Sequence, residues 1–222
     1  MTIWAFLVQS VFRAYAYEFF TTWCPAFLEK AYGLSKVEAA SLTTLPLWTL
    51  GLGSLVSGYV VDVVWIRTGN RWLSRSGLAC GGLAACGGCF ALATQLDNPR
   101  WVMALIAAGA LAASVSGPAT WATTMARGPP RALVATWATT MDLGGPRAAV
   151  LAGVMNMLGN VGAYLCPKQI GQLFNHIEVT EGSWDLVLWV FAGVNLVGGA
   201  AWLLVNPSAG SRLDPGEPKT AP

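Results

Sequence analysis

Apolar positions in this chain gather into long runs without a charged side chain, and charged positions gather between them. A helix needs about 20 apolar residues to cross the hydrocarbon core of a bilayer. Five runs reach that length, and each predicts one transmembrane helix. They are Ala39–Val61, Gly77–Leu96, Trp101–Ala126, Ala148–Pro167 and Leu186–Val205.

A sixth segment, Ile3–Leu28, is equally apolar but contains Arg13 and Glu18. A cleaved signal peptide is the alternative interpretation. It would need a positively charged start and an apolar stretch of only about 7–15 residues, and the segment has neither. We therefore expect an all-α integral membrane fold, with six transmembrane helices in one domain over residues 1–205.

The composition agrees with a chain surrounded by lipid. Hydrophobic residues make up 55% of the 222 residues, charged residues only 11%, and the mean hydropathy is +0.52. Soluble domains carry about 25% charged residues. The net charge of +2, without a basic cluster, argues against a nucleic-acid partner.

The cysteines predict packing rather than metal or redox chemistry. All of them fall inside or at the ends of the expected helices: Cys24, Cys80, Cys86, Cys89 and Cys166. The C-x-x-C at Cys86 and Cys89 has no second pair and no histidine beside it. We expect no metal site, no cofactor and no disulfide scaffold.

Basic residues are distributed unequally between the two sides of the membrane. One side holds eight of them: Arg67, Arg71, Arg75, Arg127, Arg131, Arg147, Arg212 and Lys219. The other side holds Lys30, Lys36, Arg100 and Lys168. The positive-inside rule then places both termini in the cytoplasm, in an inner or plasma membrane. Residues 206–222 are rich in Pro, Gly and Ser and are expected to form a disordered cytoplasmic tail.

Arg13 is the most informative side chain. About twelve residues of helix, or 18 Å, separate it from the start of the chain. Because a charge in mid-membrane costs at least about 2.5–3.5 kcal/mol, it either faces a cavity or snorkels to the cytoplasmic edge. Tyr17 shares the Arg13 face and is expected to hydrogen-bond an anionic ligand beside it. Glu18 is a candidate for proton coupling, with a water-facing or interhelical role as the alternative.

Two asparagines, Asn156 and Asn160, are four residues apart and so lie on one face of the fifth long run. Amides in a membrane helix either bond across to another helix or line a water-filled path. Both interpretations stay open, and the second makes them candidate substrate-binding residues.

Three stretches resemble the organic anion:cation symporters of the major facilitator superfamily, a branch with hexuronate, glucarate and phthalate carriers. Phe12–Ser35, FRAYAYEFFTTWCPAFLEKAYGLS, is similar to the seventh helix of that branch. Gly58–Arg75 resembles the cytoplasmic motif between helices eight and nine, and Asp142–Pro167 resembles the entry to helix eleven. The resemblance covers roughly residues 1–205.

The resemblance implies the carboxy-terminal half of a transporter, helices seven to twelve, built as two inverted three-helix repeats. It also implies proton- or sodium-coupled symport of a small organic anion. The gate motif falls on Gly58, Asp62, Gly69, Arg71 and Arg75. Ordinary loop charges are the alternative for Asp62 and its arginines, because Val63 stands where the family has a basic residue. Six of the twelve family helices are absent, so we expect an amino-terminal half or a second copy as partner.

Residues 119–134 and 135–150 are nearly the same sixteen residues repeated, identical at twelve positions. The family pattern has this segment once, between helices ten and eleven. The sequence Gly128-Pro129-Pro130 prevents one continuous helix, because proline breaks helices and restricts the preceding residue. We expect an extended cytoplasmic loop that arose by tandem duplication and interrupts the domain.

An intramembrane enzyme is the main rival class. A serine protease needs a Ser and a His on facing helices, and no expected span contains His. The chain also lacks H-E-x-x-H. The one histidine, His176, is expected in a solvated outer loop between Gln169 and Trp184. We therefore expect no enzyme, while a non-transporting fragment remains an alternative.

Overall fold

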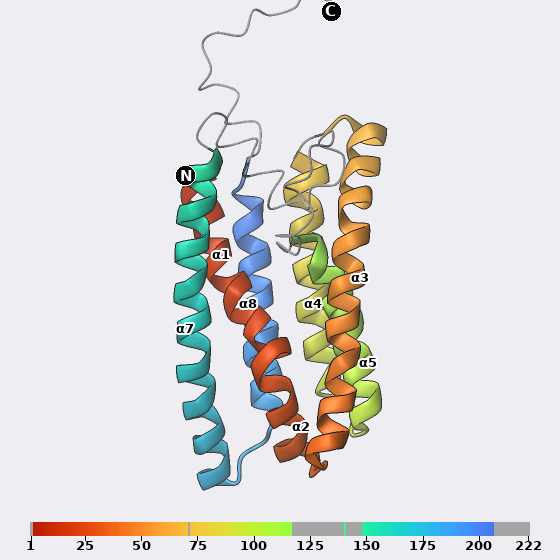
Figure 1. Ribbon diagram of the computed structural model, residues 1–222, viewed down its shortest axis with the longest axis vertical. Coiled ribbons are helices and arrows are strands. Elements are labelled where there is room, and N and C mark those ends of the chain that lie inside the picture. Colours follow the sequence, from red (N-terminus) through yellow and green to blue (C-terminus); the bar gives the residue numbers. More distant parts are fainter. Residues whose placement is uncertain (1, 71, 117–139, 141–147, 207–222) are drawn as a thin grey trace, which may run out of the picture.

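The computed structural model describes residues 2–70, 72–116, 140 and 148–206. The regular elements in these ranges are all helical (Figure 1). In chain order they are α1 (Thr2–Glu18), the π-helix η1 (Phe19–Trp23), α2 (Cys24–Tyr32), α3 (Lys36–Thr68), the π-helix η2 (Leu73–Gly77), α4 (Leu78–Ala93), α5 (Pro99–Ala113), the 3-10 turn η3 (Ser114–Ser116), α7 (Ala148–Thr180) and α8 (Asp185–Leu203).

Five helical stretches within the described ranges are long and apolar enough to cross a membrane. They are Lys36–Thr68, Leu73–Ala93, Pro99–Ser116, Ala149–Thr180 and Asp185–Leu203. Each overlaps one of the charge-free runs, which confirms the expectation of an all-α membrane protein. Helix α1, with 17 residues, is not in this set, although α1 and α2 together follow the bundle from one end to the other (Figure 1).

The first segment is continuous but locally widened. Pro25 lies in the first turn of α2 and has no backbone N–H to continue the hydrogen-bond ladder. The turn before it, Phe19–Trp23, is a π-helix, the wider geometry that inserts into α-helices where the ladder is disturbed. The widening separates the upper part of the segment, which carries Arg13, from the lower part.

The expected loop after Pro167 is wrong, because α7 passes through this proline and ends at Thr180. His176 is therefore an exposed helical residue, not a loop residue. The reason is packing: Cys166, Ile170, Phe174 and Ile177 continue one buried stripe at helical spacing. Their burial outweighs the one hydrogen bond that proline removes.

Helix α3 has strong signals at both ends. Ser35 accepts a hydrogen bond from the Glu38 backbone, and the Glu38 carboxylate accepts one from the Ser35 backbone N–H at 3.1 Å, a capping box. Gly69 ends the helix with φ +61°, a left-handed conformation that glycine adopts without strain.

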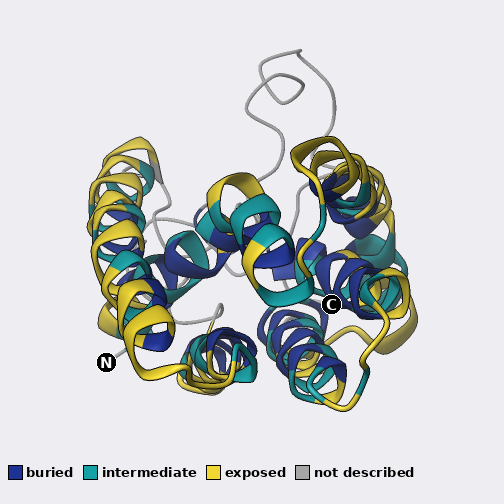
Figure 2. Cartoon of the chain, turned by 90° about the horizontal axis from the view of Figure 1, so that it is seen from below, coloured by how far each residue is buried: buried dark blue, intermediate teal, exposed yellow. Residues whose placement is uncertain are grey.

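Helices that follow one another along the chain run in alternating directions. In the view of Figure 1, α1, α4 and α7 run downward and α3, α5 and α8 run upward. Helix α1 packs against α7 and α8, α5 packs against α3 and α4, and α4 packs against α8. Seen along the bundle, most exposed residues lie on the outward sides of the helices (Figure 2).

Glycines allow the closest helix contacts. A Cβ on Gly162 of α7 would collide with the carbonyl of Val11 and come within 3.1 Å of the Tyr15 nitrogen, both on α1. A Cβ on Gly82 of α4 would likewise collide with the Ala112 carbonyl of α5. Small residues at such crossings are what holds membrane helices together where lipid is as apolar as the side chains.

Three expectations fall largely outside the described residues. The duplicated segment is described only at Thr140 and at 148–150, and the predicted tail only at Asn206. Arg71 of the gate motif also lies outside. The loop, the tail and the role of Arg71 stay predictions.

Candidate functional site

A cavity of about 190 Å³, open to the surface on one side, lies between α1, α3, α4, α8 and the end of α5 with η3. Most of its wall is apolar, which makes the few polar side chains on it distinctive. They are Arg13, Tyr17, Ser54, Ser114, Ser116 and Asn195. A largely apolar cavity with a few convergent polar groups is the usual form of a small-molecule site.

Helix α1 turns one face toward this cavity. Gly162 of α7 meets α1 at Val11 and Tyr15, and Gly198 of α8 meets it at Phe12. Arg13 and Tyr17, four residues apart, lie on the remaining side. The packing therefore leaves Arg13 and Tyr17 together on the face of α1 that lines the cavity, as their spacing predicts.

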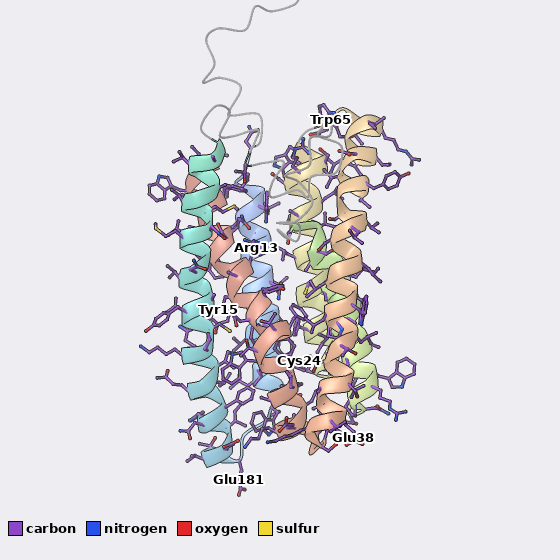
Figure 3. All side chains as sticks on the ribbon, viewed as in Figure 1. Arg13, Tyr15, Cys24, Glu38, Trp65 and Glu181 are labelled. Atoms are coloured by element: carbon purple, nitrogen blue, oxygen red, sulfur yellow. The ribbon has the colours of Figure 1, made fainter. Side chains whose placement is uncertain are left out.

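The Arg13 guanidinium has no charge partner among the described residues. Its Nε is buried without a hydrogen bond, and the residue lies well within the length of the bundle (Figure 3). One salt bridge in the described ranges joins Lys30 and Glu178 at the lower end, far from Arg13 along the bundle, 2.6 Å from Nζ to Oε1. No Asp or Glu is among the residues that line the cavity. A partly buried positive charge without a counter-charge favours an incoming anion.

Glu18 does not supply the missing charge. It is half-buried, and its Oε2 accepts a hydrogen bond from the Thr22 hydroxyl at 2.9 Å, one turn further along. Five residues of helix rotate it away from Arg13, as its spacing predicts. Its coupling role stays a prediction.

The structure does not bring Asn156 and Asn160 to the cavity. Both are exposed on α7, and α7 does not line the cavity. In the chain by itself they face away from the neighbouring helices. Their role in substrate binding stays a prediction that depends on what covers this face of α7.

The gate motif gathers at the end of the bundle where α3 stops. Gly58 is buried in α3, Asp62 is half-buried one turn later, and Gly69 caps the helix with its N–H on the Trp65 carbonyl at 2.8 Å. Arg75 follows in η2. The described part of the motif therefore lies where α3 ends and η2 begins.

Sequence reasoning missed Asn195, which lies on α8 and is only 2% exposed. Its Nδ2 donates to the Phe191 carbonyl at 2.8 Å. A signal was available, because Asn195 is the one amide side chain in the run Leu186–Val205. Polar residues inside a membrane span are functional candidates by default.

The hydroxyl hydrogens of the cavity serines are already used, so these serines can accept a hydrogen bond from a ligand but not donate one to it. Ser54 donates its hydroxyl hydrogen to the Leu50 carbonyl at 2.7 Å, and Ser114 donates to Leu111 at 2.6 Å. Hydrogen-bond donors for an anion therefore come from α1 and α8. Within the described residues, no group of three His, Cys, Asp or Glu side chains could hold a metal ion.

The sequence profile of the Major Facilitator Superfamily matches residues 6–222, nearly the whole chain. A D-galactonate transporter of Escherichia coli O6:H1 is 28% identical over 159 residues, which is 70% of this chain and 32% of the relative.

Two further relatives cover more of this chain. A protein of Bacillus subtilis (strain 168) named "Probable galactarate/D-glucarate transporter GudP" is 24% identical over 93% of this chain and 41% of its own length. A protein of Cupriavidus necator named "Probable sulfoacetate transporter SauU" is 29% identical over 85% of this chain and 39% of its own length. The chain thus spans roughly a third to two fifths of these relatives. Their transporter names, with the profile match, confirm the expectation that the chain is not an enzyme.

Proposed function

Since the chain belongs to the major facilitator superfamily, we propose that it forms the carboxy-terminal half of a transporter for small organic anions. The observation that carries the proposal is the Arg13 guanidinium, which lines a cavity without a counter-charge. A guanidinium stays charged at any physiological pH and offers a planar fork that matches a carboxylate. Sugar acids and sulfoacetate, named for the relatives, all carry such an acidic group.

The six-helix arrangement of the proposal is two inverted three-helix repeats, the first ending with α4 and the second beginning with α5. Exchanging α1 with α5, α3 with α7 and α4 with α8 reproduces the same set of contacts among these six helices. The exchange also reverses every helix direction (Figure 1). This supports an inverted repeat, the common plan of such transporters.

The remaining parts of the proposal concern the second half and the membrane. An amino-terminal six-helix half, or a second copy, covers the open side and meets Asn156 and Asn160 of α7. Glu18 is the candidate for coupling to protons or sodium. Both termini, the gate motif around Asp62 and the duplicated loop lie on the cytoplasmic side of an inner or plasma membrane.

The test is uptake by this chain co-expressed with an amino-terminal half from a related transporter, using D-galactonate, D-glucarate and sulfoacetate. Arg13→Lys keeps the charge but loses the fork and should weaken uptake about tenfold, while Arg13→Ala should abolish it. Membrane insertion of both variants is checked on blots. Normal uptake by the inserted Arg13→Ala variant would mean that Arg13 merely snorkels, and the proposal would fail.

A non-transporting fragment is the second candidate, favoured by the share of the relatives that the chain spans. A reading frame directly upstream that encodes six further helices would favour the split transporter over the fragment.

A further inference from the structure

A second pocket, of about 440 Å³, lies at the lower end of the bundle (Figure 1). Three separate parts of the chain build it: the end of α2, the turn between α4 and α5, and the turn from α7 into α8. Its wall is mostly polar, and it shares no lining residue with the cavity that holds Arg13. Polar side chains far apart in the sequence therefore meet at a place that the proposed transport does not use.

The lining residues of this pocket include two carboxylates and no basic side chain. Asp97 comes from the turn between α4 and α5, and Asp185 is the first residue of α8. The Asp97 carboxylate makes no hydrogen bond or ion pair with a described residue. Asp185 accepts a hydrogen bond from the neutral hydroxyl of Ser183 at 2.8 Å. Glu178, at the same end of the bundle, is by contrast already paired with Lys30. The lining residues thus leave the negative charge of the pocket unbalanced.

The hydroxyl of Tyr32 shows how the two charges act inside the pocket. Tyr32 is the last residue of α2, beyond the apolar part of the first segment, and is partly buried. This burial and the nearby charges of Asp185 and Asp97 raise the pKa of Tyr32. An environment that disfavours a negative charge because of two neighbouring carboxylates favours a positive charge at the same point.

Aromatic rings complete the wall. Phe27, Tyr32 and Trp184 all line the pocket. Packing holds these rings in place, because Phe27 meets Tyr32 edge to face with ring centres 6.0 Å apart, and Trp184 meets Phe174 in the same way at 5.0 Å. Aromatic rings attract cations within about 6 Å and are the usual surroundings of bound alkylammonium groups. A metal ion instead requires oxygen ligands on all sides.

We propose that this pocket binds a small organic cation, a methylated or primary ammonium, with Asp97 and Asp185 as counter-charges and Tyr32 and Trp184 as the aromatic wall. One water takes about 30 Å³ in the liquid, so the volume has room for an ammonium group with several carbon atoms. The site goes beyond the proposed function and does not depend on it, because no residue of the Arg13 cavity takes part. With the proposed topology the pocket faces the outside of the cell.

The experiment uses the purified full chain in a neutral detergent at neutral pH, titrated with choline and followed by saturation-transfer NMR on the ligand. Dimethylbutanol, in which a carbon atom replaces the ammonium nitrogen of choline, is the control ligand. Choline should bind saturably, and dimethylbutanol at least about tenfold more weakly. Equal binding of the two, or no saturable binding of choline, would overturn the proposal. Tighter binding of Ca²⁺ than of choline would assign the pocket to a metal ion and would overturn it as well.

The carboxylates are tested by Asp97→Asn and Asp185→Asn, which keep the size of the side chain and remove its charge. Each should weaken choline binding about fivefold, the loss of one charge at close range in a wet site. Glu181→Gln removes a charge from the same turn between α7 and α8, on an exposed residue outside the pocket (Figure 3), and should leave binding within about twofold. Equal losses in all three variants would show that overall charge attracts the cation, and the site would be refuted.

The aromatic wall is tested by comparing Trp184→Phe with Trp184→Leu, which both shorten the side chain while only the first keeps a ring. The leucine variant should bind choline at least about threefold more weakly than the phenylalanine variant, with equal binding of dimethylbutanol. Equal choline binding by the two folded variants would contradict the proposed wall. If Trp184→Leu does not give a normal melting curve, Tyr32→Phe and Tyr32→Leu provide the same comparison.

Discussion

Lys30 and Arg13 are two cations in opposite situations. Lys30 lies at the lower end of the bundle, and Arg13 lies well within its length (Figure 3). Lys30 is paired with Glu178 at 2.6 Å, but both side chains are about half exposed, 54% and 42%. Arg13 has a buried Nε and no charge partner among the described residues. Water already stabilises the first cation, so its partner adds little. No carboxylate among the described residues stabilises the second, so an arriving anion gains most there.

A salt bridge is therefore a poor guide to function in this chain. A pair at the water interface is formed because two long side chains happen to reach each other. A lone guanidinium in the interior persists although it costs stability, and such a cost is typical of binding sites.

The largest effect is expected from reversing the charge of Arg13, with the same reversal at Lys30 as the control. Arg13→Glu should reduce anion uptake by the co-expressed halves at least about a hundredfold, or about 2.7 kcal/mol, because it replaces attraction by repulsion. Lys30→Glu, with the same charge change, should leave uptake within about twofold. Uptake rates at matched membrane levels give the measurement. Similar losses in both variants would show that overall charge matters, not the cavity.

The next effect concerns the contact that holds α1 in place. Gly162→Ala should lower stability by about 1–3 kcal/mol, because the added Cβ meets the Val11 carbonyl and the backbone cannot give way. Gly153→Ala, on the same helix, has nothing within 4 Å of its Cβ and should be neutral or slightly stabilising. Melting temperatures in one detergent compare the two. Equal stability of both variants would mean that α1 is not fixed by α7, and that Arg13 is free to leave the cavity.

A smaller effect is expected from the Lys30–Glu178 pair itself. A double-mutant cycle with Lys30→Ala and Glu178→Ala should give a coupling of about 0.2–1 kcal/mol that shrinks as salt is added. Unfolding in detergent at low and high salt measures it. A coupling above about 2 kcal/mol, insensitive to salt, would show that this pair is as shielded as Arg13 and would remove the contrast.

The smallest effect is expected from the duplicated segment. Deleting residues 119–134 leaves the second copy with every junction residue, so insertion and melting temperature should match those of the parent. Alkali extraction of membranes and a melting curve test this. Loss of insertion on deletion alone would show that the first copy is structural.

The described spans were predictable because membrane helices need long uncharged runs, and loops collect the charges. The error after Pro167 had a local cause: the expected helix ended with the charge-free run, just before Lys168. The stripe of Ile170, Phe174 and Ile177 was present in the sequence but lay beyond the apolar run. Arg13 and Tyr17 were predictable as neighbours on one face of the helix, because residues four apart lie one helical turn from each other.

The long uncharged runs were enough to identify a helical membrane protein and to place one guanidinium deep in its first segment. The side of each helix that faces the cavity follows instead from how the helices pack. Helices apolar on every side carry almost no directional signal, so the choice rests on close crossings such as Gly162 on Val11 and Gly198 on Phe12, between residues far apart in the chain. Those crossings turn Arg13 and Asn195 toward the cavity and leave Asn156 and Asn160 outside.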